Sequence, residues 1–190
     1  MKVIIATGNP GKVKEIGLAI APLGWEALSL KDFQLEMPEE TETTYEGNAL
    51  LKSRAICNAT GIAALADDSG LEVEALGNEP GVYSARYGGD LPSDQARYEL
   101  LLKNLGANTH RKAKFVSVVV VSHPDGTDEF YRGEVEGYIT REPRGSGGFG
   151  YDPVFFVPDY GCTMAELTPE EKHAISHRGR ALKALIAAHP

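Results

Sequence analysis

Apolar runs and helical spacings divide the first part of the chain into strands and a helix. Residues 3–6 form a short apolar run, which predicts a buried strand. A helix is expected next, with Asn9 as its N-cap and Pro10 at its first position. Its apolar face is expected to hold Val13, Ile16 and Ile20. Residues 25–30 can then form a second strand.

A second helix is predicted over residues 45–60 and is closed by Gly61. Its inward face is expected to carry mostly small residues, namely Ala49, Ser53, Ile56 and Ala59. The apolar run of residues 62–66 and the segment 71–75 predict strands. They flank the sequence Asp67-Asp68-Ser69-Gly70, for which the pattern predicts a turn.

The second half of the chain begins with a helix capped by Ser93 and stopped by Gly106. The β-branched run of residues 115–121 gives the strongest strand signal. A turn at residues 123–126 and partial alternation over 130–140 indicate a long antiparallel hairpin.

Two helices are predicted near the end of the chain, the first begun by a capping box at Thr168 and the second capped by Ser176. Strands alternate with helices early and form a hairpin late. The predicted fold class is therefore α/β, with a mixed sheet flanked by helices. The 190 residues contain no repeat and no linker, so we expect one domain over residues 1–190.

Composition and charge narrow the possible functions. The chain is 42% hydrophobic and 24% charged, as is typical of globular proteins, and its net charge is −8. Binding to nucleic acid requires a basic surface, so this partner is not expected, whereas a small phosphorylated ligand is compatible. The first apolar run is too short for a signal peptide or membrane span. Cys57 and Cys162 are interpreted as reduced thiols, and we expect a cytoplasmic protein without a membrane partner.

The adjacent carboxylates Asp67 and Asp68 are the first candidate for chemistry. An acid pair beside a buried run is costly to desolvate unless a positive group compensates it. Mg²⁺ is a hard cation that suits carboxylates and often binds together with a phosphate. A capped turn without any function is the alternative, because Asp and Ser are common in turns.

Residues 7–12, Thr7-Gly8-Asn9-Pro10-Gly11-Lys12, join the first strand to the first helix. Such a junction directs backbone N–H groups and the positive helix end toward one place, which suits a phosphate. The glycine spacing is not that of a P-loop, and Val13 stands where a Mg²⁺-binding hydroxyl would be. A capped helix with a surface lysine is the alternative.

Residues 145–150 contain a formal G-x-G-x-x-G, but no helix is expected after it, so a dinucleotide site is rejected. The loop could instead be a flexible connection. It could also form part of a nucleobase pocket, with Phe149, Gly150, Tyr151 and Asp152. The basic run 172–180 is either an ordinary helix start or a place where Lys172, His177 and Arg178 meet an anion or a base carbonyl.

The acidic residues Glu39, Glu40 and Glu42 form a further candidate. Such a run is ordinarily a solvated surface. One of these acids could complete a metal site with Asp68, but the composition does not select which one.

Together these segments closely resemble the inosine triphosphate pyrophosphatase family, nucleotide hydrolases that act on non-canonical purine triphosphates. The resemblance covers nearly the whole chain in the family's order, at residues 7–15, 39–41, 48–52, 66–71, 81–87, 147–156 and 170–182. It implies an elongated mixed α/β fold with two lobes and a central active-site cleft, usually as a homodimer. It also implies Mg²⁺-dependent hydrolysis of ITP, dITP and XTP to the monophosphate and pyrophosphate.

The resemblance assigns roles residue by residue. Asp68 matches the proton acceptor and, with Glu40, the metal-site acids. The phosphate-binding set matches residues 7–12 and Lys52, and Ser69 matches a substrate contact. The nucleoside-binding set matches Phe149, Gly150, Tyr151, Asp152, Lys172, His177 and Arg178.

One position departs from the family's pattern. Many members carry an acid just before the asparagine at Asn48, where this chain has Gly47, and Glu46 is the nearest acid. Two other functions stay open: a nucleotide pyrophosphatase of different base specificity, and a nucleotide-binding module without catalysis.

Overall fold

The computed structural model describes all 190 residues. They form two compact units. Unit 1 contains Met1–Asp68, Ser117–Gly133 and Arg178–Pro190. Unit 2 contains Ser69–Val116 and Glu134–His177.

The strands form one mixed eight-stranded sheet in the order β2-β1-β3-β5-β6-β7-β8, with β4 paired to β3. β1 is parallel to both β2 and β3, whereas β4, β7 and β8 pair antiparallel. The strands are β1 (Lys2–Ile5), β2 (Glu26–Ser29), β3 (Ala63–Val73), β4 (Glu79–Gly81), β5 (Lys112–Ser122), β6 (Asp128–Ile139), β7 (Phe155–Val157) and β8 (Cys162–Thr163). The predicted mixed sheet flanked by helices is confirmed.

The five α-helices are α1 (Pro10–Ile20), α2 (Tyr45–Thr60), α3 (Asp94–Leu105), α4 (Pro169–Ile175) and α5 (His177–Ala188). The predicted caps are present at three of them. The Asn9 side chain accepts hydrogen bonds at the start of α1, Ser93 does so at α3, and Thr168 forms a capping box at α4. None of the helices is long and apolar enough to cross a membrane.

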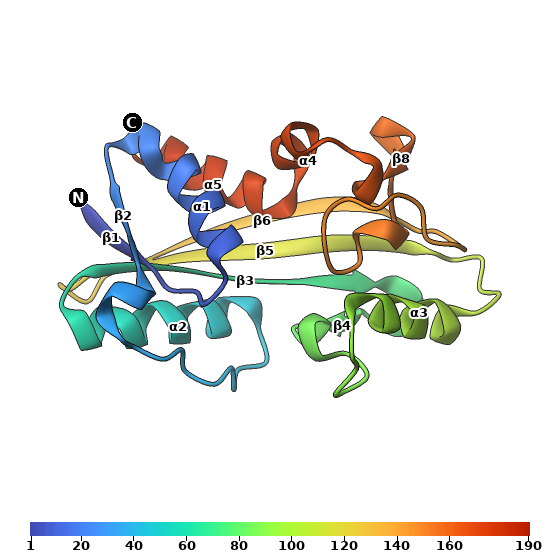
Figure 1. The fold of residues 1–190 in the computed structure, drawn as a ribbon, viewed down its shortest axis with the longest axis horizontal. Helices are drawn as coiled ribbons and strands as arrows, with labels where there is room; N and C mark the ends of the chain where they lie inside the picture. Colours follow the sequence, from blue (N-terminus) through green and yellow to red (C-terminus); the bar gives the residue numbers. More distant parts are fainter. The chain divides into compact units, whose positions relative to one another are not determined.

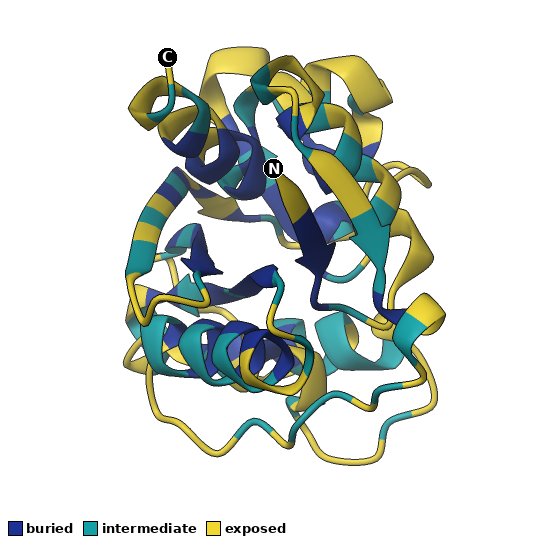
Figure 2. Ribbon diagram, turned by 90° about the vertical axis from the view of Figure 1, so that its left-hand side faces the viewer, coloured by how far each residue is buried: buried dark blue, intermediate teal, exposed yellow.

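In unit 1, helices cover both faces of the sheet. Figure 1 shows α1 and α5 on one face and α2 on the other. Ala63 and Leu65 of β3 pack with α1 and α5, whereas Ala64 and Ala66 pack with α2. β1 is buried along Val3–Ile5, as Figure 2 shows, because helices cover both of its faces.

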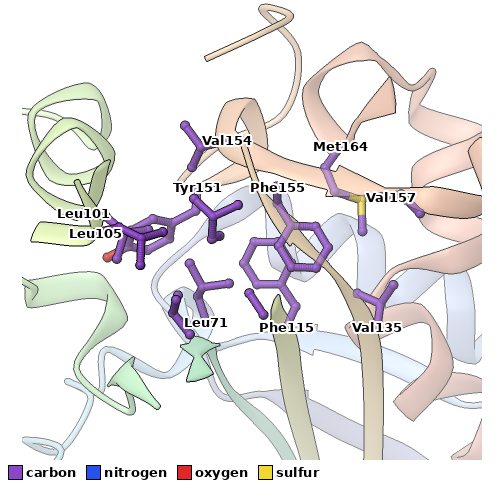
Figure 3. Packing of buried hydrophobic residues seen from close by; sticks show 13 residues of the cluster. Leu71, Leu101, Leu105, Phe115, Val135, Tyr151, Val154, Phe155, Val157 and Met164 are labelled. Carbon is purple, nitrogen blue, oxygen red and sulfur yellow. The ribbon is translucent and has the colours of Figure 1, made fainter. Parts of the chain in front are cut away.

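Unit 2 has an aromatic core. The rings of Phe115 and Phe155 lie 4.4 Å apart between centroids, and Figure 3 shows them side by side. Leu101 and Leu105 of α3 pack into the same cluster together with Tyr151.

Two local predictions are wrong. The sequence Asp67-Asp68-Ser69-Gly70 is not a turn, because β3 runs without a break from Ala63 to Val73. Ala59 is exposed rather than on the inward face of α2, because that face is filled by Ala49, Ser53 and Ile56 and by the neighbouring Lys52 and Cys57.

Candidate active site

The two adjacent carboxylates of β3 point to opposite faces of the sheet. Side chains alternate along a strand, so Asp67 continues the row of Leu65 and Asp68 continues the row of Ala66. The parallel partner β1 ends at Ile5, which is in register with Leu65. Both carboxylates therefore lie just past the carboxyl end of β1, the edge at which parallel sheets usually bind ligands.

Asp67 lies in a buried ion cluster on the face of α1 and α5. Both of its carboxylate oxygens accept hydrogen bonds from Lys12 Nζ, each at 3.0 Å. Arg178 Nε donates to the same carboxylate at 3.0 Å, and Arg178 Nη1 donates to Glu15 at 3.0 Å. One buried carboxylate thus joins the first turn of α1 to the first turn of α5.

The charges in this cluster compensate one another. Burial alone would raise the pKa of Asp67, but the positive charges of Lys12 and Arg178 outweigh it and hold the pKa far below the ordinary value. Burial likewise opposes the charge of Arg178, and Asp67 and Glu15 raise the pKa of its guanidinium. Asp67 and Arg178 are therefore both charged at neutral pH.

On the opposite face, Lys52 of α2 lies between two acids. Its Nζ donates to Glu40 Oε1 at 2.7 Å and lies 3.5 Å from Asp68 Oδ1. The other oxygen of Asp68, Oδ2, is buried without a hydrogen-bond partner. Glu39 is exposed, so the geometry selects Glu40 from the acidic run.

Burial raises the pKa of Asp68 to about 6, against the opposing effect of Lys52 and the Asn48 amide. The negative charge of Glu40 adds to the rise. The pKa of Lys52 is raised because its acidic neighbours outweigh its burial. A carboxylate with a pKa near neutrality is well suited to accept a proton.

The loop of residues 7–12 lies at the same edge of the sheet as Asp67. Its start is fixed by Ala6 N, which donates to Leu65 O at 2.7 Å. The Asn9 side chain accepts from the amides of Gly11 and Lys12 at 2.8 and 3.3 Å. Gly8 has open space around the position of a Cβ. The backbone of this loop can therefore be approached closely by a ligand.

A second set of predicted residues lies in unit 2, around the glycine loop. Asp152 is buried and pairs with Lys172 Nζ, and it also accepts from Phe149 N at 2.9 Å. Lys172 Nζ lies 4.2 Å from the centroid of the Phe149 ring. Phe149 is 59% exposed. These contacts hold an aromatic ring at the surface beside one cation.

The remaining members of this set have structural partners of their own. Tyr151 is buried and donates through its hydroxyl to Ser84 O at 2.7 Å, and Gly150 N donates to Asp94 at 2.8 Å. The His177 ring stacks on Phe115 at 4.9 Å between centroids. Ser69 is half-buried in β3.

Comparison with known proteins identifies the family. A sequence model described as the Ham1 family matches residues 3–188. The chain belongs to the Ham1 family.

Close relatives of this Ham1 chain carry one common name. A protein of Thermus thermophilus named dITP/XTP pyrophosphatase is 56% identical over 191 residues, covering 100% of this chain and 92% of its own length. One of Deinococcus radiodurans with the same name is 55% identical over 188 residues, covering 99% and 92%. The Staphylococcus aureus Ham1 protein matches with a TM-score of 0.92 and 42% identity, over 99% of this chain and 97% of that one. The family predicted from the sequence is confirmed.

The Ham1 fold groups the predicted residues into two sets. Lys12, Lys52, Glu40, Asp68 and Arg178 lie in unit 1 around the two carboxylates of β3. Arg178 was grouped by its sequence with the basic run 172–180, but that run divides between two helices, with Lys172 on α4 and Arg178 on α5. Its guanidinium contacts Asp67 and Glu15.

The sequence assigns no role to two members of this Ham1 site. Asp67 is a candidate there only as half of the acid pair, with the role given to Asp68, and Glu15 is not singled out. A strand assignment would have placed Asp67 on the face of α1, since alternation separates adjacent side chains. The pairing of Glu15 with Arg178 joins residues 163 positions apart, and no pattern in the sequence predicts it.

Proposed function

We propose that this protein hydrolyses non-canonical purine nucleoside triphosphates, such as dITP, XTP and ITP, to the monophosphate and pyrophosphate. The observation that carries the proposal is the buried carboxyl of Asp68, whose pKa is about 6 and which lies within 3.5 Å of Lys52. A protein that only binds nucleotides does not need a proton acceptor of this kind, whereas a hydrolase does. The names of the relatives support the same reaction.

We propose Mg²⁺ as the cofactor, held by Glu40 and Asp68. No group of three or more His, Cys, Asp or Glu side chains is placed to hold a metal. Two carboxylates still fit Mg²⁺, because this ion commonly takes one or two protein carboxylates together with waters and substrate phosphates. The unpartnered Asp68 Oδ2 is an oxygen ligand of the right chemistry. When bound, the ion would neutralise phosphate charge and lower the pKa of a water.

The protein's own groups then account for the reaction. Asp68 accepts the proton of the water that attacks the α-phosphorus, and pyrophosphate is the leaving group. Lys52, Lys12 and the N-terminal amides of α1 offset the charge that develops on pyrophosphate. Lys12 is held at a fixed position by Asp67, so little reorganisation is needed when the phosphates bind.

We propose that the second set of residues binds the nucleoside. Phe149 offers an exposed ring for stacking on a purine, and Lys172 and His177 are donors of the kind that a 6-carbonyl accepts. Arg178 uses Nε and Nη1 for Asp67 and Glu15, so a contact to the base would use its other terminal nitrogen. Adenine presents an amino group at position 6, which these donors do not match.

Pyrophosphate release tests the proposal. We expect rapid release from dITP with Mg²⁺, loss of release after EDTA, and recovery when Mg²⁺ is restored. dATP should be hydrolysed much more slowly, because its 6-amino group is a donor. Equal rates with dATP and dITP would contradict the base-recognition part, and release that EDTA leaves unchanged would contradict the metal part.

Gly148→Ala tests the nucleoside set. A Cβ at this position would lie 2.0 Å from Asp152 Oδ2 and 3.1 Å from Lys172 Nζ, so it would separate this ion pair. We expect the KM for dITP to rise about 10-fold, because the free energy of roughly one charge-assisted hydrogen bond to the substrate is lost. Gly161→Ala is the matched control, because Gly161 has a similar left-handed backbone but open space around it. A KM that rises equally in both variants would show that only backbone strain was measured.

We also propose that the protein acts as a homodimer, as the family resemblance implies, and that it is cytoplasmic, as its sequence predicts. Light scattering on the purified protein measures the dimer directly, and a monomer mass at micromolar concentration would contradict it.

A further inference from the structure

The acidic loop that carries Glu40 has no regular structure between η2 (Leu30–Phe33) and α2. Its Glu40 side chain nevertheless meets Lys52 at 2.7 Å. A loop of this kind is mobile unless side chains bind its backbone.

Asn48 makes that contact. It lies on the first turns of α2 and is fully buried. Glu42 N donates to Asn48 Oδ1 at 3.0 Å, and Asn48 Nδ2 donates to Glu42 O at 3.3 Å. The amide thus binds the main chain of one loop residue, two positions after Glu40, and it also contacts the Asp68 carboxylate.

The neighbouring Gly47 lets the loop approach the helix. A Cβ at position 47 would lie 2.8 Å from Glu42 Cβ and 3.0 Å from Thr44 Oγ1. The space above Gly47 is thus filled by the Glu42 side chain. Glu46, the nearest acid, turns instead to Arg132 at 2.7 Å on the surface.

Helix capping does not explain Asn48. The start of α2 is already capped by Thr44, whose Oγ1 accepts from Gly47 N at 3.0 Å. An alanine at position 48 would keep that cap and favour the helix. The buried asparagine is explained instead by its two bonds to the loop and by the contact of its amide with Asp68.

We propose that Asn48 is a positioning residue that fastens the acidic loop to α2 and thereby sets Glu40 beside Asp68 as a pair of metal-site acids. The inference rests on the proposed function, since it assumes that Glu40 and Asp68 act together on a divalent cation. Gly47 is the second part of the arrangement, because only glycine leaves room for Glu42.

Asn48→Ala and Ser53→Ala form the matched test. Ser53 is also buried on α2, but its hydroxyl bonds to Leu50 O and Ser122 Oγ, away from the loop. In the metal-free protein, we expect the Glu42 amide to exchange hydrogen at least 10-fold faster in Asn48→Ala than in Ser53→Ala. Binding of Mn²⁺, followed by electron paramagnetic resonance, should weaken about 10-fold or more in Asn48→Ala, as is typical when an outer partner of a metal site is lost.

Gly47→Ala provides a second variant that retains Asn48. Alanine favours the helix, so α2 itself should not be weakened, and a change at the metal-site acids would come from the loop that the new Cβ displaces. The proposal predicts faster exchange at Glu42 and weaker Mn²⁺ binding, since the added methyl displaces the loop.

The inference is overturned if Asn48→Ala binds Mn²⁺ as tightly as Ser53→Ala, or if the Glu42 amide exchanges equally in both. Neither readout depends on hydrolysis. Failure of the proposed function would be seen separately, as no release of pyrophosphate from dITP by the unsubstituted protein.

Discussion

Asp68→Asn should lower the kcat for dITP by about 10²- to 10⁴-fold, the usual contribution of a general base. The amide keeps the size of the carboxyl but cannot accept a proton from water. The variant should fold, and its Tm at pH 7.5 should equal or exceed that of the original protein. Burial raises the pKa of Asp68 to about 6. The ionised carboxylate therefore destabilises the folded protein at pH 7.5, and asparagine removes this effect.

Steady-state pyrophosphate release and thermal unfolding, measured on the same preparation, give both results. Glu72→Gln is the matched control, because Glu72 is another carboxylate of β3 and is paired with Lys114 at 3.6 Å. This control should retain its kcat within about twofold. A kcat for Asp68→Asn that also stays within twofold would remove Asp68 from the role of proton acceptor.

Asp67→Asn should have the largest effect on stability. The substitution leaves the buried Arg178 and the Lys12 amine without the carboxylate that accepts three of their hydrogen bonds. Removing one partner of a buried ion pair typically lowers the free energy of unfolding by about 3–5 kcal/mol. Hydrolysis should also fall, because Lys12 loses the contact that holds it.

Urea unfolding measures this loss, with Glu15→Gln as the control. Glu15 pairs with the same Arg178, at 3.0 Å, but its side chain is 29% exposed. Water can replace part of this contact, so the free energy of unfolding of the control should fall by about 1 kcal/mol or less. Equal decreases in the free energy of unfolding of the two variants would show that Asp67 stabilises the cluster no more than a partly exposed partner does.

Local signals in the sequence predict an element correctly where neighbouring residues determine its conformation. Asn9 begins α1, and α2 runs over Tyr45–Thr60 as predicted, because caps and glycine stops act within a few residues. The acid pair differs, because its conformation depends on distant partners. Asp67-Asp68-Ser69-Gly70 has turn propensity, but β3 is paired with β5 in the sheet, and cations contact Asp67 and Asp68 on opposite faces.

The candidate site was predictable in its residue types but not in its contacts. Asp68 is a candidate from the residues themselves, the family resemblance adds Glu40 and Lys52, and the structure brings the three side chains together. The link between Arg178 and Asp67 could not be predicted, because it depends on how α5 packs against β3 from 111 residues away. Spacing in the sequence carries no information about such a contact.

Hydrolysis of dITP in ¹⁸O-labelled water tests the central claim most directly. If Asp68 activates a water that attacks the α-phosphorus, mass spectrometry should find one ¹⁸O in the deoxyinosine monophosphate and none in the pyrophosphate. Label in the pyrophosphate, or formation of the diphosphate with labelled inorganic phosphate, would contradict the account.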